Sequence, residues 1–122
     1  MRVSYAIVFV SDMQRSVAFY RDVIGLPLKF DSPEWSEFTT EGATIALHRA
    51  EKSAEPEGNT DMPAGHCRPG LSVSDLDGFH TRMVEHQVIC TQQPKDLFGS
   101  KIAQYLDPDG LVISVSEETS RP

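Results

Sequence analysis

The sequence contains few cysteines, no long apolar segment and little positive charge. Its 122 residues include only two cysteines, Cys67 and Cys90, too few for a disulfide framework and typical of reduced thiols. No stretch approaches the roughly 18 consecutive apolar residues of a membrane span. The residues after Met1 lead into an alternating pattern rather than a signal-peptide core. These absences predict a cytoplasmic protein that does not enter a membrane.

The charge balance narrows the choice of partners. Eleven basic residues against 18 acidic ones give a formal net charge of -7. Nucleic acids and anionic membranes attract clustered Lys and Arg, so we expect neither as a partner. A neutral or cationic small ligand fits this balance better, although acids that merely keep a surface soluble would give the same charge.

A short motif occurs twice at a strand-to-helix corner. Val10–Met13 reads Val-Ser-Asp-Met, and Val73–Leu76 reads Val-Ser-Asp-Leu. In each copy the Asp can accept a backbone N–H bond at a helix N-terminus, and the next residue begins an apolar stripe with helical spacing. The chain therefore looks like one structural unit used twice within a single domain, 1–122.

Apolar periodicity and turn residues give the order of the elements. We expect helices over residues 13–25 and 76–86, and a strand over 3–10 that is buried on both faces. The other expected strands cover 28–31, 35–40, 43–49, 68–74, 88–92, 101–106 and 111–116. The first unit is then 1–49, the linker 50–66 and the second unit 67–118, with Asp107–Gly110 as the clearest hairpin turn.

The repeated unit, the segment Ser11–Tyr20 followed by Val23–Leu26, and the Asp-Pro-Asp-Gly hairpin resemble the vicinal oxygen chelate superfamily. That superfamily includes glyoxalase I, fosfomycin and bleomycin resistance proteins, extradiol dioxygenases and methylmalonyl-CoA epimerase. The resemblance implies an α+β fold of two tandem βαβββ units. Their mixed sheets would form half-open barrels around a ligand cavity, often with a divalent metal on its wall.

The family's metal positions hold unsuitable residues in this chain. In catalytic members the ligands come from the first and last strands of each unit, and the equivalent positions are Tyr5, Ala46, Arg68 and Ser114. A guanidinium has no lone pair to offer and repels a cation. We therefore expect no cofactor at these positions, and metal-dependent glyoxalase, fosfomycin-opening or dioxygenase chemistry is in doubt.

A relocated site is one alternative. His48 lies two residues after Ala46 and so points to the same side of its strand, while Glu37 and Trp35 share a face of the neighbouring strand. Across the Glu41-Gly42 turn, Glu37 and His48 could form half of a divalent metal site or an acid–base pair. The competing interpretation is a partly buried His satisfied by a neighbouring Glu.

Five further residues are candidate ligand contacts. A charged residue on a cavity strand must have a partner, so Arg68 either forms a bridge to Glu37 or binds an anionic group of a ligand. Aromatic walls and polar groups of this kind line many small-molecule pockets. The candidate contacts are Tyr5, Trp35, Arg68, Gln104 and Ser114.

The remaining histidines and cysteines have plainer interpretations. His66 would approach a metal position only if the strand register slipped by two residues, and otherwise it is a loop residue. His80 and His86 are expected on the outer surface of the second helix. Cys67 and Cys90 are expected in the core.

Two functions of different classes follow from the resemblance. The first is a glyoxalase/bleomycin resistance-like protein that binds a small molecule without metal catalysis, as a homodimer. The second is a glyoxalase-like lyase or isomerase that uses Glu37 and His48. Besides these two, a structural or regulatory module that has lost its chemistry is a third possibility.

Overall fold

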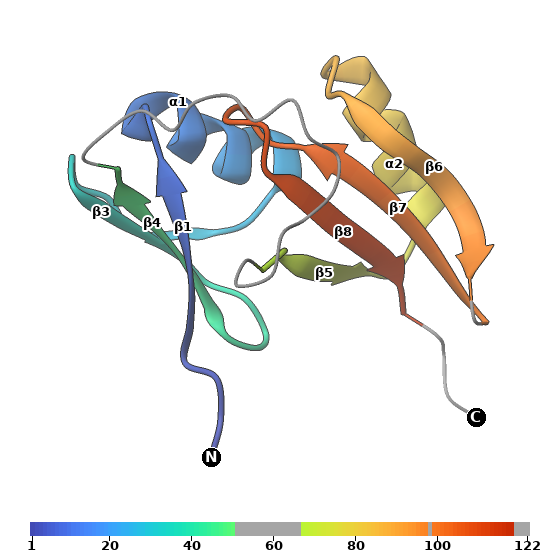
Figure 1. The fold of residues 1–122 in the computed structure, drawn as a ribbon, viewed down its shortest axis with the longest axis horizontal. Coiled ribbons are helices and arrows are strands. Elements are labelled where there is room, and N and C mark those ends of the chain that lie inside the picture. The colour runs from blue at the N-terminus through green and yellow to red at the C-terminus, as the bar shows by residue number, and fades with distance from the viewer. Residues whose placement is uncertain (51–66, 98, 119–122) are drawn as a thin grey trace. The chain divides into compact units, whose positions relative to one another are not determined.

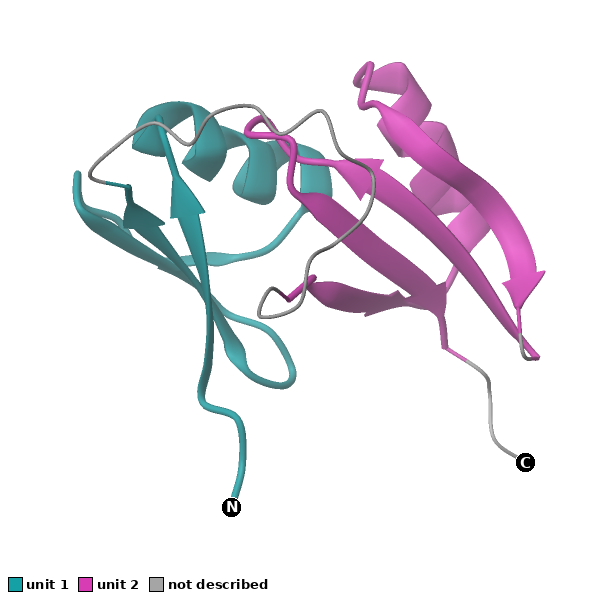
Figure 2. Ribbon diagram, in the orientation of Figure 1, with its two compact units in different colours: residues 1–58 teal, residues 59–122 magenta. Residues whose placement is uncertain are grey.

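The computed structural model describes residues 1–50, 67–97 and 99–118. The chain divides into two compact units, residues 1–58 and 59–122 (Figure 2), and each is described by itself. Most of the predicted linker 50–66, including His66, lies outside the described residues.

Unit one is a four-stranded mixed sheet with a helical segment on one face (Figure 1). The strand order is β1-β4-β3-β2, with β1 parallel to β4 and the other neighbours antiparallel. Along the chain the elements are β1 (Tyr5–Val10), α1 (Met13–Ala18), the π-helical η1 (Phe19–Ile24), β2 (Leu28–Phe30), β3 (Trp35–Phe38) and β4 (Thr44–Arg49).

The local signals in unit one act as predicted at both ends of the helical segment. The Asp12 carboxylate accepts the Arg15 backbone N–H at 3.1 Å and begins α1. Gly25, with φ of 97°, takes the left-handed conformation that ends the segment. The second half is a π-helix rather than the expected α-helix, because the Gly25 N–H bonds five residues back to the Tyr20 carbonyl.

Unit two repeats this arrangement. Its sheet has the order β5-β8-β7-β6, with β5 parallel to β8, and Asp75 caps its helix by accepting the Gly78 N–H at 3.1 Å. The elements are β5 (Gly70–Val73), α2 (Leu76–Glu85), β6 (Cys90–Leu97), β7 (Ser100–Leu106) and β8 (Val112–Glu117). The Asp107–Gly110 hairpin joins β7 and β8, and Gly110 has the expected positive φ of 85°.

Strand β6 differs from the prediction. We expected a strand over residues 88–92, but β6 begins at Cys90 and continues through Pro94 to Leu97. Its pairing with β7 shifts register twice, between Cys90 and Gln92 and between Gln92 and Lys95. Proline is tolerated here because β6 is an edge strand and the ladder is already broken by these irregularities.

The cores lie between each sheet and its helix. Segment α1 packs on β3 and β4, and α2 packs on β6, β7 and β8. The buried apolar side chains of these cores are Val8, Val10, Met13, Val17, Tyr20, Phe38, Ile45 and Leu47 in unit one, and Leu76, Met83, Ala103, Tyr105, Ile113 and Val115 in unit two. Ala46 is also buried, but on the other face of the unit-one sheet. The predicted α+β class and the two βαβββ units are confirmed, and each sheet is open rather than closed into a barrel.

Two burial predictions are wrong. Strand β1 is not buried on both faces, because Val8 and Val10 face the core while Tyr5, Ile7 and Phe9 are exposed. Cys67 is exposed rather than part of a core. Among the described residues, no helix is long and apolar enough to cross a membrane.

Candidate functional site

The face of the unit-one sheet that points away from α1 carries an exposed set of aromatic and apolar side chains. The strand register places Phe9, His48 and Trp35 in one row, and Ile7, Ala46 and Glu37 in the next. We call this surface the open face. Its members are Tyr5, Ile7, Phe9, Phe30, Trp35, Glu37, Ala46 and His48.

Four rings on the open face form a continuous chain of contacts. The centroids of Tyr5 and Trp35 are 6.1 Å apart, those of Trp35 and His48 are 5.9 Å apart, and those of His48 and Phe9 are 5.3 Å apart. The planes meet at 65°, 90° and 48°, so the rings form edge and tilted contacts rather than a flat stack. Tyr5 is 48% exposed and Phe9 is 63% exposed, which leaves ring surface available to a ligand.

Glu37 fixes the direction of the Trp35 side chain. The indole Nε1 donates to Glu37 Oε2 at 2.8 Å, and Lys29 Nζ lies 3.9 Å from the other carboxylate oxygen. The indole thus reaches from its own row across the row of Ala46 toward Tyr5, and the small Ala46 side chain leaves room for it. Glu37 gives the open face one half-buried negative charge.

His48 has a defined tautomer when neutral. Its Nδ1 lies 2.7 Å from the Arg49 carbonyl oxygen, which can only accept, so Nδ1 carries the proton. The other nitrogen, Nε2, then keeps its lone pair. This arrangement suits a proton acceptor or a metal ligand.

The structure does not bring Glu37 and His48 together as a direct cross-strand pair. Glu37 lies opposite Ala46, and His48 lies opposite Trp35. The two predicted acid–base residues therefore share a face but lie in neighbouring rows, with the indole hydrogen-bonded to one and its ring against the other.

The predicted contacts of unit two lie on its own sheet or just before it. Gln104 of β7 is the cross-strand neighbour of Ser114 of β8, and both are half-buried. Gly70 of β5 flanks Ser114 on the other side, and Arg68 is exposed ahead of that strand. Unit two thus supplies a small polar surface, which sequence analysis assigned to a ligand.

A hydrogen-bonded cluster lies on the helix side of unit two. The Tyr105 hydroxyl is 2.9 Å from His80 Nδ1, and Cys90 is the cross-strand neighbour of Tyr105. Burial raises the pKa of Tyr105 to about 12 and also raises the pKa of the Cys90 thiol. His80 is therefore a half-buried partner of a core tyrosine, not the surface residue that the sequence predicted.

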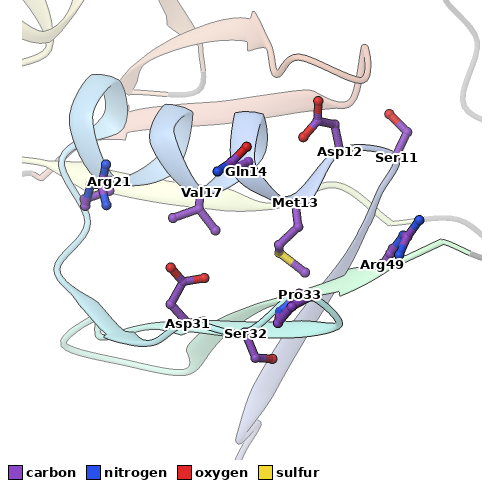
Figure 3. Close-up of a pocket in the computed structure, with 10 residues that line it drawn as sticks. All are labelled: Ser11, Asp12, Met13, Gln14, Val17, Arg21, Asp31, Ser32, Pro33 and Arg49. Carbon is purple, nitrogen blue, oxygen red and sulfur yellow. The ribbon is translucent and has the colours of Figure 1, made fainter.

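A second concave feature lies on the opposite face of the unit-one sheet. A cavity of about 770 Å³ separates α1 and η1 from the segment that joins β2 to β3 (Figure 3). Met13 and Val17 point into it from the helix, and Asp31 faces them from the other side. Sequence analysis missed this cavity, because its polar residues come from separate elements and form no motif.

Comparisons with known proteins establish the family. A model of the Glyoxalase/Bleomycin resistance protein/Dioxygenase superfamily matches residues 2–115. The chain belongs to this superfamily. The phenazine antibiotic resistance protein EhpR of Enterobacter agglomerans is 30% identical over 112 residues, which is 89% of this chain and 86% of EhpR. The metallothiol transferase FosB of Lysinibacillus sphaericus is 26% identical over 109 residues, which is 88% of this chain and 76% of FosB.

Solved structures agree with this assignment. A superfamily member from Sphaerobacter thermophilus superimposes with a TM-score of 0.76 at 25% identity, covering 97% of this chain and 98% of that protein. The resemblance noted in the sequence is therefore confirmed at the level of superfamily and fold.

The positions at which the sequence resemblance predicts metal ligands carry side chains that do not suit a metal. Ala46 offers no donor atom, and Arg68 carries a permanent positive charge. Tyr5 and Ser114 do not make up the imidazole and carboxylate set that such ions prefer. Among the residues described, no group of three His, Cys, Asp or Glu side chains could hold a metal ion. We assign no reaction step to a metal at these positions.

Proposed function

We propose that this superfamily member binds an organic small molecule on the open face, as a homodimer and without a metal at the superfamily's ligand positions. The observation that carries the proposal is the exposed chain of rings formed by Tyr5, Trp35, His48 and Phe9. Aromatic side chains contribute large contact areas and favour edge or offset contacts with a further ring.

The ligand class follows from the chemistry of the open face. Ile7 and Phe30, which are 46% and 52% exposed, extend the apolar surface beyond the rings. Glu37 adds a single carboxylate at its centre, so a neutral or cationic aromatic compound fits better than an anion. The name of EhpR, a phenazine resistance protein, supports an aromatic ligand as a starting point. Arg68, Gln104 and Ser114 belong to unit two and stay predicted ligand contacts that are not part of the open face.

The proposed homodimer has its support in strand β1. It is the edge strand of its sheet and presents Tyr5, Ile7 and Phe9 to the outside. Exposed apolar edge strands are common sites of pairing with another chain. Light scattering coupled to size-exclusion chromatography tests this part: a single monomer mass across the micromolar range would contradict it.

The binding proposal has a direct test because the chain has a single tryptophan, Trp35. A phenazine added to the protein should change Trp35 fluorescence in a saturable way. Phe9→Ala should weaken binding about tenfold, the loss expected when an aromatic contact of about 1.4 kcal/mol is removed. Ile89→Ala is the matched control, because Ile89 is equally exposed at 63% but belongs to unit two and is not one of the open-face residues. Equal affinities for both variants would place the ligand elsewhere.

A lyase or isomerase is the second candidate, and the His48 Nε2 lone pair is the observation that favours it. As a base, His48 would remove a proton next to a carbonyl of a small hydroxy ketone, and its imidazolium would return that proton to the neighbouring carbon. The Glu37 carboxylate would take the hydroxyl proton and pass it to the carbonyl oxygen. Deuterium exchange next to the carbonyl, followed by proton NMR in D₂O, measures this step. Deuterium exchange in the parent protein that is lost in His48→Gln would favour the enzyme. If no ketone of a panel exchanges, small-molecule binding is the one proposed function left.

A relocated metal site is tested separately. Zn²⁺ that binds only the native protein must raise its melting temperature. A rise in the parent protein that is lost in His48→Ala would assign the ion to the open face. The same rise in both proteins would assign it elsewhere.

A further inference from the structure

The cavity behind α1 is separate from the open face, because the two lie on opposite sides of the unit-one sheet. Its volume of about 770 Å³ is in the range of small-molecule sites, roughly 300 to 1,000 Å³. Its lining combines apolar residues with charges of both signs, and the proposed function uses none of them.

The centre of the cavity is apolar. Met13 and Val17 lie one helical turn apart on the buried side of α1 and are 8% and 4% exposed. Figure 3 shows both side chains directed from the helix toward the segment of Asp31, Ser32 and Pro33. An apolar group of a ligand could rest against these two side chains.

Two of the four charged residues in the lining already have partners that satisfy them. Arg21 holds the Asp22 carboxylate through two hydrogen bonds of 2.8 and 2.9 Å. Asp12 caps α1 through the Arg15 backbone N–H. Arg21 is therefore paired with Asp22, and the Asp12 carboxylate is used to cap α1.

The other two charged residues, Asp31 and Arg49, have hydrogen-bonding atoms that a ligand can use. Asp31 accepts a hydrogen bond from Ser36 Oγ to Oδ1 at 3.1 Å, and among the described residues its Oδ2 has no hydrogen-bond donor, although the Arg21 charge attracts this carboxylate. Within the part of the chain that the structure describes, Arg49 pairs with Glu34 alone, through one nitrogen at 3.4 Å, and most of its five donors have no partner there. Both side chains are exposed and line the cavity from different strand ends.

The size of the cavity sets the length of the ligand. The lining follows the helical segment from Met13 to Arg21, which corresponds to roughly 12 Å along the axis. An extended peptide covers about 3.3 Å per residue, so a peptide of three residues, about 10 Å long, fits within this length. The Gln14 amide, which also lines the cavity, can bond a peptide group between the two ends.

We propose that this cavity is a second binding site that takes a short zwitterionic peptide of about three residues with an apolar middle side chain. The peptide's ammonium group lies at Asp31, its carboxylate lies at Arg49, and its middle side chain packs on Met13 and Val17. The proposal does not depend on the ligand of the open face.

The probe for this site is the tripeptide Ala-Leu-Ala, added to the full-length protein and followed by amide chemical shifts. Saturable shifts should concentrate on the cavity residues, Met13, Gln14, Val17, Asp31 and Arg49. Capping the amino terminus with acetyl, or the carboxyl terminus as an amide, should each weaken binding about tenfold, since each removes one charged contact. No shifts at 10 mM, or equal binding of the doubly capped peptide, would overturn the proposal.

Three variants sharpen the test. Asp31→Asn removes the charge but keeps an acceptor for Ser36 Oγ, so the fold is preserved. Peptide binding should fall about tenfold in this variant, and by the same factor in Arg49→Gln. Glu34→Gln removes the competitor for Arg49 and should leave binding equal or tighter. Weaker binding in Glu34→Gln than in Arg49→Gln would show that the ion pair only supports the structure, and would overturn the assignment of the carboxylate.

Discussion

The Trp35 indole and the Glu37 carboxylate, two residues apart on β3, are joined by a hydrogen bond of 2.8 Å from Nε1 to Oε2. Alternation along a strand places both side chains on the same face, and the bond turns the indole along its own strand. The bond therefore decides where the ring surface of the open face lies. It also takes up one oxygen of the only carboxylate among the open-face residues.

Removing that acceptor should loosen the indole. In Glu37→Leu the Nε1–H loses its partner, so we expect a red-shifted and more easily quenched emission of the single tryptophan, with a stability loss of about 1 to 2 kcal/mol. Glu37→Gln keeps an acceptor oxygen and should resemble the parent protein. Acrylamide quenching and urea unfolding measure both effects. Identical quenching in Leu and Gln variants would mean that the hydrogen bond does not hold the ring.

Two buried serines of unit one should respond in opposite ways to replacement by alanine. Both are fully buried, but Ser16 Oγ has no hydrogen-bond partner among the described residues, while Ser36 Oγ donates to Asp31 Oδ1. Ser16→Ala removes an unsatisfied hydroxyl from a helix and should stabilise the protein by about 1 kcal/mol. Ser36→Ala should destabilise it by a similar amount. Thermal unfolding of both variants is the measurement, and a lower melting temperature for Ser16→Ala would indicate that its hydroxyl bonds to a buried water.

Tyr105 should make the protein sensitive to high pH. Its folded-state pKa is raised to about 12, above the ordinary value of 10 expected when unfolded. The folded state thus holds the phenolic proton more tightly, so this contribution is complete below pH 10 and is lost as pH rises from 10 to 12. Its full size is about 3 kcal/mol at most.

The matched variant is Tyr105→Phe, which removes the titrating group and also the hydrogen bond to His80. It should be about 1 kcal/mol less stable at pH 8, yet lose less stability between pH 9.5 and 11.5 than the parent protein. Urea unfolding at a series of pH values gives the slope of the unfolding free energy against pH for the parent protein and for the variant. Parallel slopes would show that Tyr105 does not control the alkaline loss.

The sequence predicted the fold well because its strongest signals are local. Asp12 and Asp75 cap helices, Gly25 ends one and Gly110 completes a tight turn, and each depends only on a few neighbouring residues. The repeat of these signals was enough to indicate two units of the same order. Superfamily comparison then agreed with the prediction.

The parts that failed depend on distant partners. Whether Phe9 is buried is decided by what covers that side of β1, and the course of β6 through Pro94 is decided by its edge position in the sheet. His80 is half-buried because Tyr105, 25 residues away, reaches it from β7. Glu37 and His48 lie in neighbouring rows because His48 is two residues farther from the Glu41-Gly42 turn than Glu37, an offset that an exact count from the turn gives. The direction of the Trp35 indole, by contrast, depends on its hydrogen bond to Glu37.

The carboxylate of Asp107 should be a main determinant of unit-two stability. It is 5% exposed and accepts the backbone N–H groups of Asp109 and Leu111, both at 2.9 Å, in the turn between β7 and β8. Asp107→Ala leaves two turn amides without this acceptor and should cost about 2 to 3 kcal/mol, whereas Asp107→Asn keeps an acceptor oxygen and should cost about half as much. Hydrogen exchange of the Leu111 amide should be faster in both variants, and fastest in the variant that loses more stability. If both variants unfolded at the same urea concentration, the cost would come from the lost charge rather than from the turn hydrogen bonds.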